Sequence, residues 1–193
     1  ERHHPGLAEL AEGFHRDFLA PVNVHLYCTP PDQHGFGWHY DAEDVFILQT
    51  AGTKEYGLRK NTVNPWPTID TLPSDMRYER EIMPLMRCVL EAGDWLYIPA
   101  GYWHMAEAEE EAISLAVGIT SPAALGLLDV LRPRLADSIL WRQRLPAAAL
   151  SEAELREHLR QVLADLQTDL GRQLASEELL EAWISQLRGE FGG

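Results

Sequence analysis

The sequence predicts a mainly β fold with α: a closed or sandwiched antiparallel barrel followed by an α-helical C-terminal region. Residues 21–121 consist of apolar or alternating runs of four to eight residues, the usual length of strands, broken by Gly, Pro and Asp. Residues 122–193 show the apolar spacing of amphipathic helices instead. Because no helix-like segment separates the strand-like runs, an antiparallel barrel is favoured over a parallel sheet.

Residues 1–20 are expected to form an N-terminal helical segment, because Leu7, Leu10, Phe14 and Phe18 recur at helical spacing. The barrel region follows from residue 21 to residue 121. Its eight expected strands are Val22–Cys28, Gly37–Tyr40, Asp44–Thr50, Thr53–Arg59, Leu85–Leu90, Trp95–Ile98, Tyr102–Ala108 and Ala112–Ile119.

Residues 122–193 are expected to form a helical packing or dimerisation region. Pro122 at a first helical position opens a helix to about residue 145, kinked at Pro133. Ser151 to Glu154 has the form of a capping box and begins a second helix, and a third is expected over Ser176–Arg188. The apolar stripe of the second helix could cover the barrel of its own chain or pair with a second chain; it consists of Leu155, Leu159, Val162, Leu163, Leu166 and Leu170.

Charge and composition exclude several classes of protein. The 30 acidic residues outnumber the 16 basic ones, and the net charge of −14 disfavours nucleic acid as a partner and suits a basic protein or peptide. No apolar run approaches the roughly 20 residues of a membrane-spanning helix, and the first residues lack the apolar core of a signal peptide. They also lack an initiator Met, so a trimmed fragment is one interpretation. Cys28 and Cys88 are expected to be buried free thiols of a cytoplasmic protein.

Three residues form a candidate metal site. Residues two apart on a strand point to the same face, so His39 and Asp41 could aim into the barrel together. Taken alone, this H-x-D triplet could equally be a surface histidine beside a turn aspartate. His104 changes the interpretation, because two turns and a short strand deliver it to a strand that an antiparallel barrel can bring across from His39. Two imidazoles and one carboxylate leave three positions of a metal open, which is the ligand set of non-haem Fe(II) oxygenases, whereas a structural zinc would want four protein ligands.

Lys54 lies fifteen positions after His39. If its strand pairs with the one that follows Asp41, its ammonium points into the same cavity, where a buried lysine needs an anion. A dicarboxylate that chelates iron at one end would supply that anion at the other. The alternative is that Lys54 faces solvent and pairs with Glu55 or another acid.

Two further segments have a functional and a bland interpretation. The loop at residues 61–86, with the exposed-looking Trp66, is either a lid or substrate groove, or a packed surface loop. The acidic residues at 107 and 109–111 either attract a basic peptide or form a solvated turn. The remaining histidines, His25 among them, are interpreted as surface or packing residues.

Together these motifs resemble the JmjC-type, cupin-fold 2-oxoglutarate oxygenases over about residues 20–130. The closest resemblance is to the ribosomal-oxygenase branch, which hydroxylates Arg or His side chains of ribosomal proteins. The motifs that carry it are Asn23 to Pro30, His39-Tyr40-Asp41, Val45 to Gln49, Lys54, Gly93-Asp94, Tyr97-Ile98-Pro99, His104 and Ser114 to Ile119.

The resemblance implies a double-stranded β-helix (cupin or jelly-roll) barrel with Fe(II) at His39, Asp41 and His104. It also implies 2-oxoglutarate held through Lys54, O2 as the oxidant, and no catalytic residue beyond the metal ligands. By the same matching, Tyr27 would add a hydrogen bond to the co-substrate and Ser114 would lie near it. The implied partner is a protein substrate such as a basic ribosomal protein, in the cytoplasm, with a possible homodimer through residues 122–193.

Two features depart from this family. Its members in this branch often carry a C-terminal winged-helix unit, whereas only some seventy, wholly helical-looking residues follow the barrel here. His25 also replaces an Asn of some relatives. Three alternatives stay open: a hydroxylase of a small molecule or peptide natural product, a non-catalytic metal-binding cupin, and an interaction protein whose working part is the helical region.

Overall fold

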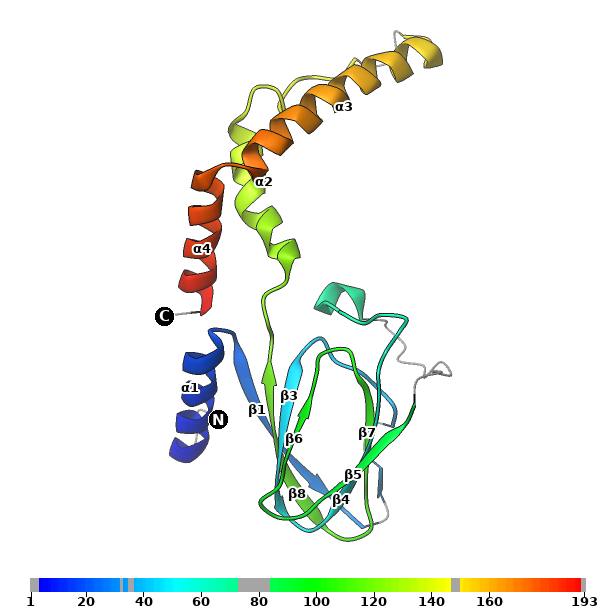
Figure 1. The fold of residues 1–193 in the computed structure, drawn as a ribbon, viewed down its shortest axis with the longest axis vertical. Helices are drawn as coiled ribbons and strands as arrows, with labels where there is room; N and C mark the ends of the chain where they lie inside the picture. The colour runs from blue at the N-terminus through cyan, green and yellow to red at the C-terminus, as the bar shows by residue number, and fades with distance from the viewer. Residues whose placement is uncertain (1–3, 32, 35–36, 73–83, 147–149, 192–193) are drawn as a thin grey trace. The chain divides into compact units, whose positions relative to one another are not determined.

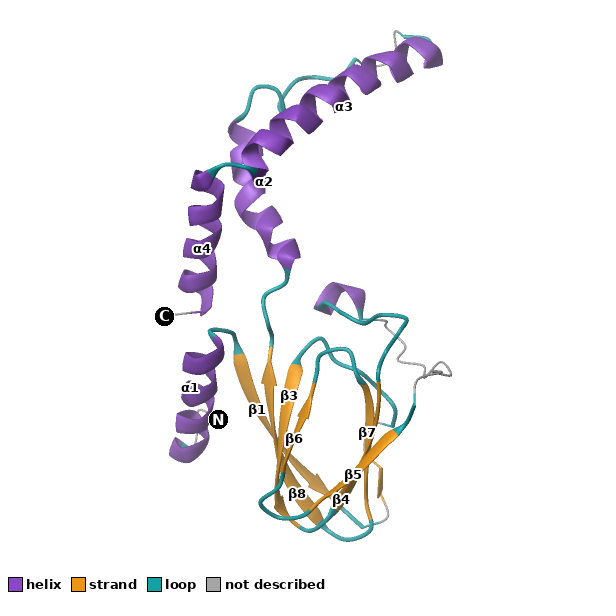
Figure 2. Cartoon of the chain, viewed as in Figure 1, coloured by secondary structure: helices purple, strands orange, loops and turns teal. Residues whose placement is uncertain are grey.

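The structure is a computed structural model, and it describes residues 4–31, 33–34, 37–72, 84–146 and 150–191. The chain divides into one unit that ends at Ser121 and a second that begins at Pro122. All the described strands lie in the first unit, and the described part of the second contains helices and loops (Figure 2).

The first unit holds eight described strands in two four-stranded sheets, with every strand pair antiparallel (Figure 1). The strand order is β1-β8-β3-β6 in one sheet and β2-β7-β4-β5 in the other. This arrangement confirms the predicted mainly β, antiparallel architecture. The strands are β1 (Val22–Thr29), β2 (Gln33–His34), β3 (Asp44–Ala51), β4 (Lys54–Arg59), β5 (Met86–Leu90), β6 (Trp95–Ile98), β7 (Trp103–Ala108) and β8 (Ala112–Ile119).

The core lies inside the barrel because the strands alternate apolar residues between their two faces. On β3, Val45 and Ile47 are buried in a cluster that also contains Tyr56, Leu58 and Ile98. Phe46 points to the opposite face of the sheet. There it meets the rings of Phe14 and Phe18, whose centroids lie 5.2 Å and 5.6 Å away. These two residues belong to α1 (Pro5–Phe18), so this helix packs against the outer face of the first sheet.

Three local features of the barrel differ from what the sequence predicted. The strand expected over Gly37–Tyr40 does not form, since Gly37 turns the chain at a φ of 69° and only His39 makes an isolated β-bridge. The short strand β2 was not predicted. Cys28 is exposed rather than buried because it lies on the outward side of β1, while Cys88 is partly buried; both thiols are free.

The loop at residues 61–86 is described only in part, because residues 73–83 lie outside the described residues. Its first turn is held by Asn61, whose Oδ1 accepts hydrogen bonds from the backbone N–H groups of Val63 (3.0 Å) and Asn64 (2.9 Å). Trp66 is 89% exposed. The packed-tryptophan interpretation of this loop is therefore wrong.

The second unit contains α2 (Leu127–Asp137), α3 (Glu152–Leu174) and α4 (Glu177–Phe191). The expected helix over residues 122–145 is shorter at both ends, because a 3-10 turn (Ala124–Gly126) precedes α2 and the extended backbone of Ser138 ends it. Pro133 lies inside α2, as predicted. The capping box of α3 is confirmed, with the Ser151 N–H donating to Glu154 Oε2 at 2.9 Å. No described helix combines the length and apolar character that crossing a membrane requires.

Candidate metal centre

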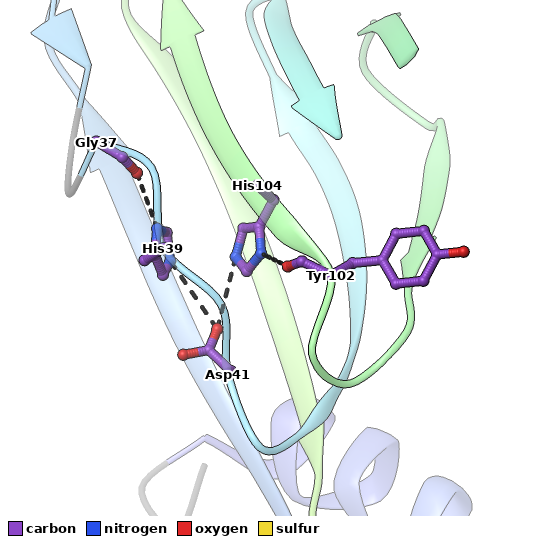
Figure 3. Close-up of polar contacts among 5 residues, drawn as sticks. All are labelled: Gly37, His39, Asp41, Tyr102 and His104. Carbon is purple, nitrogen blue, oxygen red and sulfur yellow. Dashed lines mark hydrogen bonds and ion pairs between the residues drawn. The ribbon is translucent and has the colours of Figure 1, made fainter. Parts of the chain in front are cut away.

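His39 and His104 are brought together by their backbones rather than by a shared strand. The N–H of His39 donates to the carbonyl oxygen of His104 at 3.0 Å, and the reverse hydrogen bond measures 2.8 Å. The carbonyl oxygen of Asp41 accepts from the N–H of Gly101 at 2.9 Å. The expectation that His39 and Asp41 lie on one regular strand is thus wrong, although their side chains still converge (Figure 3).

The three side chains meet around one point (Figure 3). Asp41 Oδ2 lies 3.9 Å from His39 Nε2 and 3.5 Å from His104 Nε2. One ligand atom from each residue lies within 4.8 Å of the other two. Among the described residues, this is the group of His, Cys, Asp and Glu side chains with the spacing of a metal site.

The orientation of both imidazoles is fixed by their second nitrogen. Nδ1 of His39 lies 2.9 Å from the carbonyl oxygen of Gly37, and Nδ1 of His104 lies 3.0 Å from that of Tyr102 (Figure 3). A carbonyl can only accept, so each Nδ1 carries the hydrogen, and each Nε2 is the nitrogen turned toward Asp41. Such a contact is typical of metal-binding histidines, whose ring orientation it sets.

The electrostatics of the site favour the metal-binding form of His104. Burial first, and then the neighbouring His39, lower the pKa of His104 to about 4. The imidazole is therefore neutral at physiological pH. A neutral imidazole beside an aspartate can bind a divalent cation without first releasing a proton.

A cavity of about 190 Å³ opens beside these three residues, inside the barrel. Alternate residues of β1 line one wall, namely Asn23, His25, Tyr27 and Thr29. His25 was interpreted as a surface or packing residue. It lines the cavity instead, with its ring edge-on to that of Tyr27 at a centroid distance of 6.2 Å.

Lys54 is 6% exposed, so the interpretation that it faces solvent is wrong. Its Nζ donates to Ser114 Oγ at 3.3 Å and lies 6.0 Å from the ring centres of Tyr27 and Tyr56. No carboxylate among the described residues forms an ion pair with it. Burial lowers the pKa of Lys54, and burial raises the pKa of Tyr56 to about 12. We call this end of the cavity the basic corner. It contains the ammonium of Lys54 and nearby hydroxyl groups, and no carboxylate of the described residues pairs with the ammonium.

Strand register sets the distance between this corner and the candidate ligands. On β4, Lys54 lies four residues from Leu58, and Leu58 is the register partner of His104 on β7. Four residues of strand span roughly 13 Å, and the lysine side chain covers part of that gap. The arrangement suits a small ligand with an anionic group at its far end.

Besides His25 and Thr29, the polar cavity-lining residues that sequence reasoning missed include Asn23, Glu43 and Tyr56. The period of two along a strand could have found two of them. Asn23 lies four residues before Tyr27 on β1, and Tyr56 lies two residues after Lys54 on β4. Glu43 lies just outside β3 and carries no comparable signal.

Residues 5–127 match the JmjC domain family. The chain is 33% identical over 132 residues to the bifunctional lysine-specific demethylase and histidyl-hydroxylase NO66 of Drosophila mojavensis, covering 67% of this chain and 15% of that protein. It is 33% identical over 108 residues to ribosomal oxygenase 1 of Gallus gallus, covering 54% of this chain and 17% of that protein. The chain thus spans less than a fifth of each of these relatives.

Among solved structures, the chain resembles YcfD, a ribosomal oxygenase from Escherichia coli in complex with cobalt and 2-oxoglutarate. The TM-score is 0.53 at 24% identity, over 95% of this chain and 47% of YcfD. This likeness confirms the predicted fold class, a cupin-type barrel followed by a helical region. Since the family match covers more than half of its residues, the chain belongs to the JmjC domain family.

Proposed function

We propose that this chain is an Fe(II)- and 2-oxoglutarate-dependent oxygenase that hydroxylates a protein side chain. The observation that carries the proposal is one cavity with His39, Asp41 and His104 grouped at one place and the buried Lys54 at another. A metal ligand set lies in the same small space as a buried cation that forms no ion pair among the described residues, and this combination calls for a ligand that binds both.

The donor set fits a metal that must keep open positions. Two imidazoles and the carboxylate of Asp41 would occupy one face of an ion, as in non-haem Fe(II) oxygenases. When bound, the iron and its co-substrate supply the oxidative chemistry with O2. The hydrogen bonds to Gly37 and Tyr102 hold the two rings ready for that role.

The co-substrate end is held by Lys54. We infer that its ammonium binds the distal carboxylate of 2-oxoglutarate, since a buried ammonium without an anion is costly. The contact of Ser114 with Nζ and the position of Tyr27 in the cavity wall support a role for both in orienting that carboxylate. We assign no separate acid or base, because the residues of the chain bind, orient and exclude water.

For the substrate we propose Arg or His of a ribosomal protein, modified in the cytoplasm. Two observations support this choice: the names of the relatives, and the net charge of −14, which suits a basic partner. We further propose a homodimer through residues 122–193. This unit exposes large apolar side chains among its described residues, including Leu128, Ile139, Leu163 and Leu174.

The test incubates the full chain with Fe(II), 2-oxoglutarate, O2 and ribosomal proteins, and measures both succinate and the mass of each protein. We expect succinate together with the gain of one oxygen atom on a single ribosomal protein. The Lys54→Ala variant should lose both signals at low 2-oxoglutarate, whereas Lys60→Ala, which changes the other, exposed lysine, should keep them.

Two outcomes would overturn parts of the proposal. Succinate without any modified ribosomal protein would favour a small molecule or peptide natural product as the substrate. A chain that binds metal but releases no succinate with any substrate would be a non-catalytic metal-binding cupin.

A further inference from the structure

A carboxylate and a carboxamide, Glu43 and Asn23, line the cavity away from Lys54. Asn23 Nδ2 donates to Glu43 Oε1 at 2.8 Å, and Thr120 Oγ1 donates to the same oxygen at 3.0 Å. Because the amide nitrogen points at the carboxylate, Asn23 Oδ1 points elsewhere. It is buried and accepts no hydrogen bond from the described residues, which also provide no donor to Glu43 Oε2.

These two free acceptors lie together over Gly118. A Cβ on Gly118 would stand 2.4 Å from Glu43 Oε2 and 2.8 Å from Asn23 Oδ1, so the two oxygens are no more than about 5 Å apart. Gly118 itself lines the cavity. A glycine here makes room for both polar groups, and any larger residue would displace them.

Strand register separates this pair from the basic corner. Asn23 is the partner of Gly118, and Tyr27 is the partner of Ser114, four residues further along both β1 and β8. That separation is roughly 13 Å along the strands. Glu43 also follows Asp41 by two residues. The cavity thus has a basic corner at Lys54 and an acceptor pair near the candidate metal ligands. An anion bound to Lys54 would leave the two acceptors without a hydrogen-bond donor.

Asn23 Oδ1 is a buried acceptor without a donor among the described residues, and leaving it unpaired is costly, so it selects for a ligand that donates hydrogen bonds. A guanidinium carries five N–H donors in a rigid planar fork, which suits two separated oxygens, one of them charged. An ammonium is a compact point charge, and a neutral imidazole offers a single N–H. The chemistry of the pair therefore favours arginine.

We propose that Glu43 and Asn23 bind the guanidinium of a substrate arginine and thereby determine which side chain the enzyme accepts. This inference rests on the proposed function, because it assigns the substrate side of the same cavity. Of the two substrate side chains proposed, arginine and histidine, it selects arginine.

The test compares N-acetyl-arginine amide with N-acetyl-citrulline amide, its neutral isostere. Each is titrated into the full chain, metal-free and again with Zn(II) and 2-oxoglutarate, and followed by ligand-observed NMR. We expect the arginine compound to bind at least about tenfold more tightly than the citrulline compound. This ratio corresponds to the loss of one charge-assisted hydrogen bond in a buried site. Equal affinities, or no saturable binding of either compound, would overturn the proposal.

Two variants and a control sharpen the result. Glu43→Gln keeps an acceptor for Asn23 and Thr120, so it should fold normally but lose the preference for arginine. Gly118→Ala should weaken arginine binding without changing any charge. Glu107→Gln, which changes an exposed residue of β7, should bind like the parent chain. A preference for arginine that survives in Glu43→Gln would contradict the assignment.

The outcome separates this inference from the proposed function. If 2-oxoglutarate fails to bind while the metal-free chain still prefers arginine, then the oxygenase proposal is wrong and the guanidinium site stands. If 2-oxoglutarate binds and the arginine preference is absent, then the guanidinium site is wrong and the oxygenase proposal stands.

Discussion

Among the described residues, the barrel unit buries five polar or charged side chains, whereas the helical unit buries one, Asp169. Inside the barrel, the buried residues include Lys54, His104 and Ser114, whose burial costs free energy unless a ligand or hydrogen bond compensates. In the described part of the helical unit, large apolar residues such as Ile139 and Leu163 stay exposed. The difference is consistent with a barrel that binds ligands in its interior, and with a helical unit whose exposed apolar residues are available to another apolar surface.

The largest effect is expected from removing a candidate metal ligand in the barrel. Asp41→Ala should weaken metal binding by more than about 100-fold. Replacing a residue that only hydrogen-bonds to a metal ligand already lowers the metal affinity by about 10–100-fold, and a ligand itself should matter more. Calorimetric titration with Co(II) measures the change. Asp129→Ala in α2 changes an exposed aspartate of the helical unit and should leave the affinity intact. Equal affinities for the two variants would show that Asp41 is no ligand.

The next effect concerns the basic corner. Lys54→Ala should raise the concentration of 2-oxoglutarate needed for half-saturation by about 10–100-fold, as expected for loss of a charge-assisted hydrogen bond in a buried site. Lys60→Ala is the matched control, since the chain has only these two lysines and Lys60 is exposed. Half-saturation that shifts equally in both variants would remove Lys54 from the site.

Acid should destabilise the metal-free chain through His104. Its pKa is lowered from 6.5 to about 4, first by burial and then by His39. As the pH falls below about 6.5, the unfolded chain therefore takes up this proton before the folded chain does. The free energy of unfolding should fall between about pH 6.5 and pH 4, by on the order of 1–3 kcal/mol from this group.

Urea unfolding at several pH values measures this effect. His104→Asn should remove most of that slope, while His158→Asn, on the exposed face of α3, should keep it. A slope that survives unchanged in His104→Asn would assign the acid sensitivity to other groups.

The smallest effect distinguishes neighbouring residues of α3. Val162 is 7% exposed and Leu163 is 64% exposed. Val162→Ala should lower the free energy of unfolding by about 1–3 kcal/mol through the cavity it leaves, whereas Leu163→Ala should change it by less than about 0.5 kcal/mol. Light scattering should show weaker self-association only for Leu163→Ala. Unchanged self-association in that variant would count against Leu163 as part of a dimer surface.

Much of the barrel could be predicted because its signals are local. Alternating residues such as those of β3, and turns such as the one at Gly52, where φ is 66°, mark strands without tertiary information. The conformation around His39 could not be predicted, since an isolated bridge to His104 depends on residues far along the chain. The start of α2 was misplaced because Pro122 permits a helix without requiring one.

In the candidate site, too, some residues could be predicted from the sequence and others could not. His39, Asp41 and His104 have side chains whose chemistry suggested a metal site at once. Asn23 and Glu43 are twenty residues apart and share no motif. They meet because β8 lies between β1 and β3 in one sheet, which carries Gly118 between them. Only the register of three strands reveals that pair.

The central claim is that three side chains bind one metal ion and leave room beside it for a chelating co-substrate. Anaerobic titration with Fe(II), followed by 2-oxoglutarate, tests it directly by visible absorption. We expect one iron per chain and a charge-transfer band that forms only after 2-oxoglutarate is added, and that is lost in His104→Ala. Absence of the band in the parent chain, or its persistence in His104→Ala, would contradict the claim.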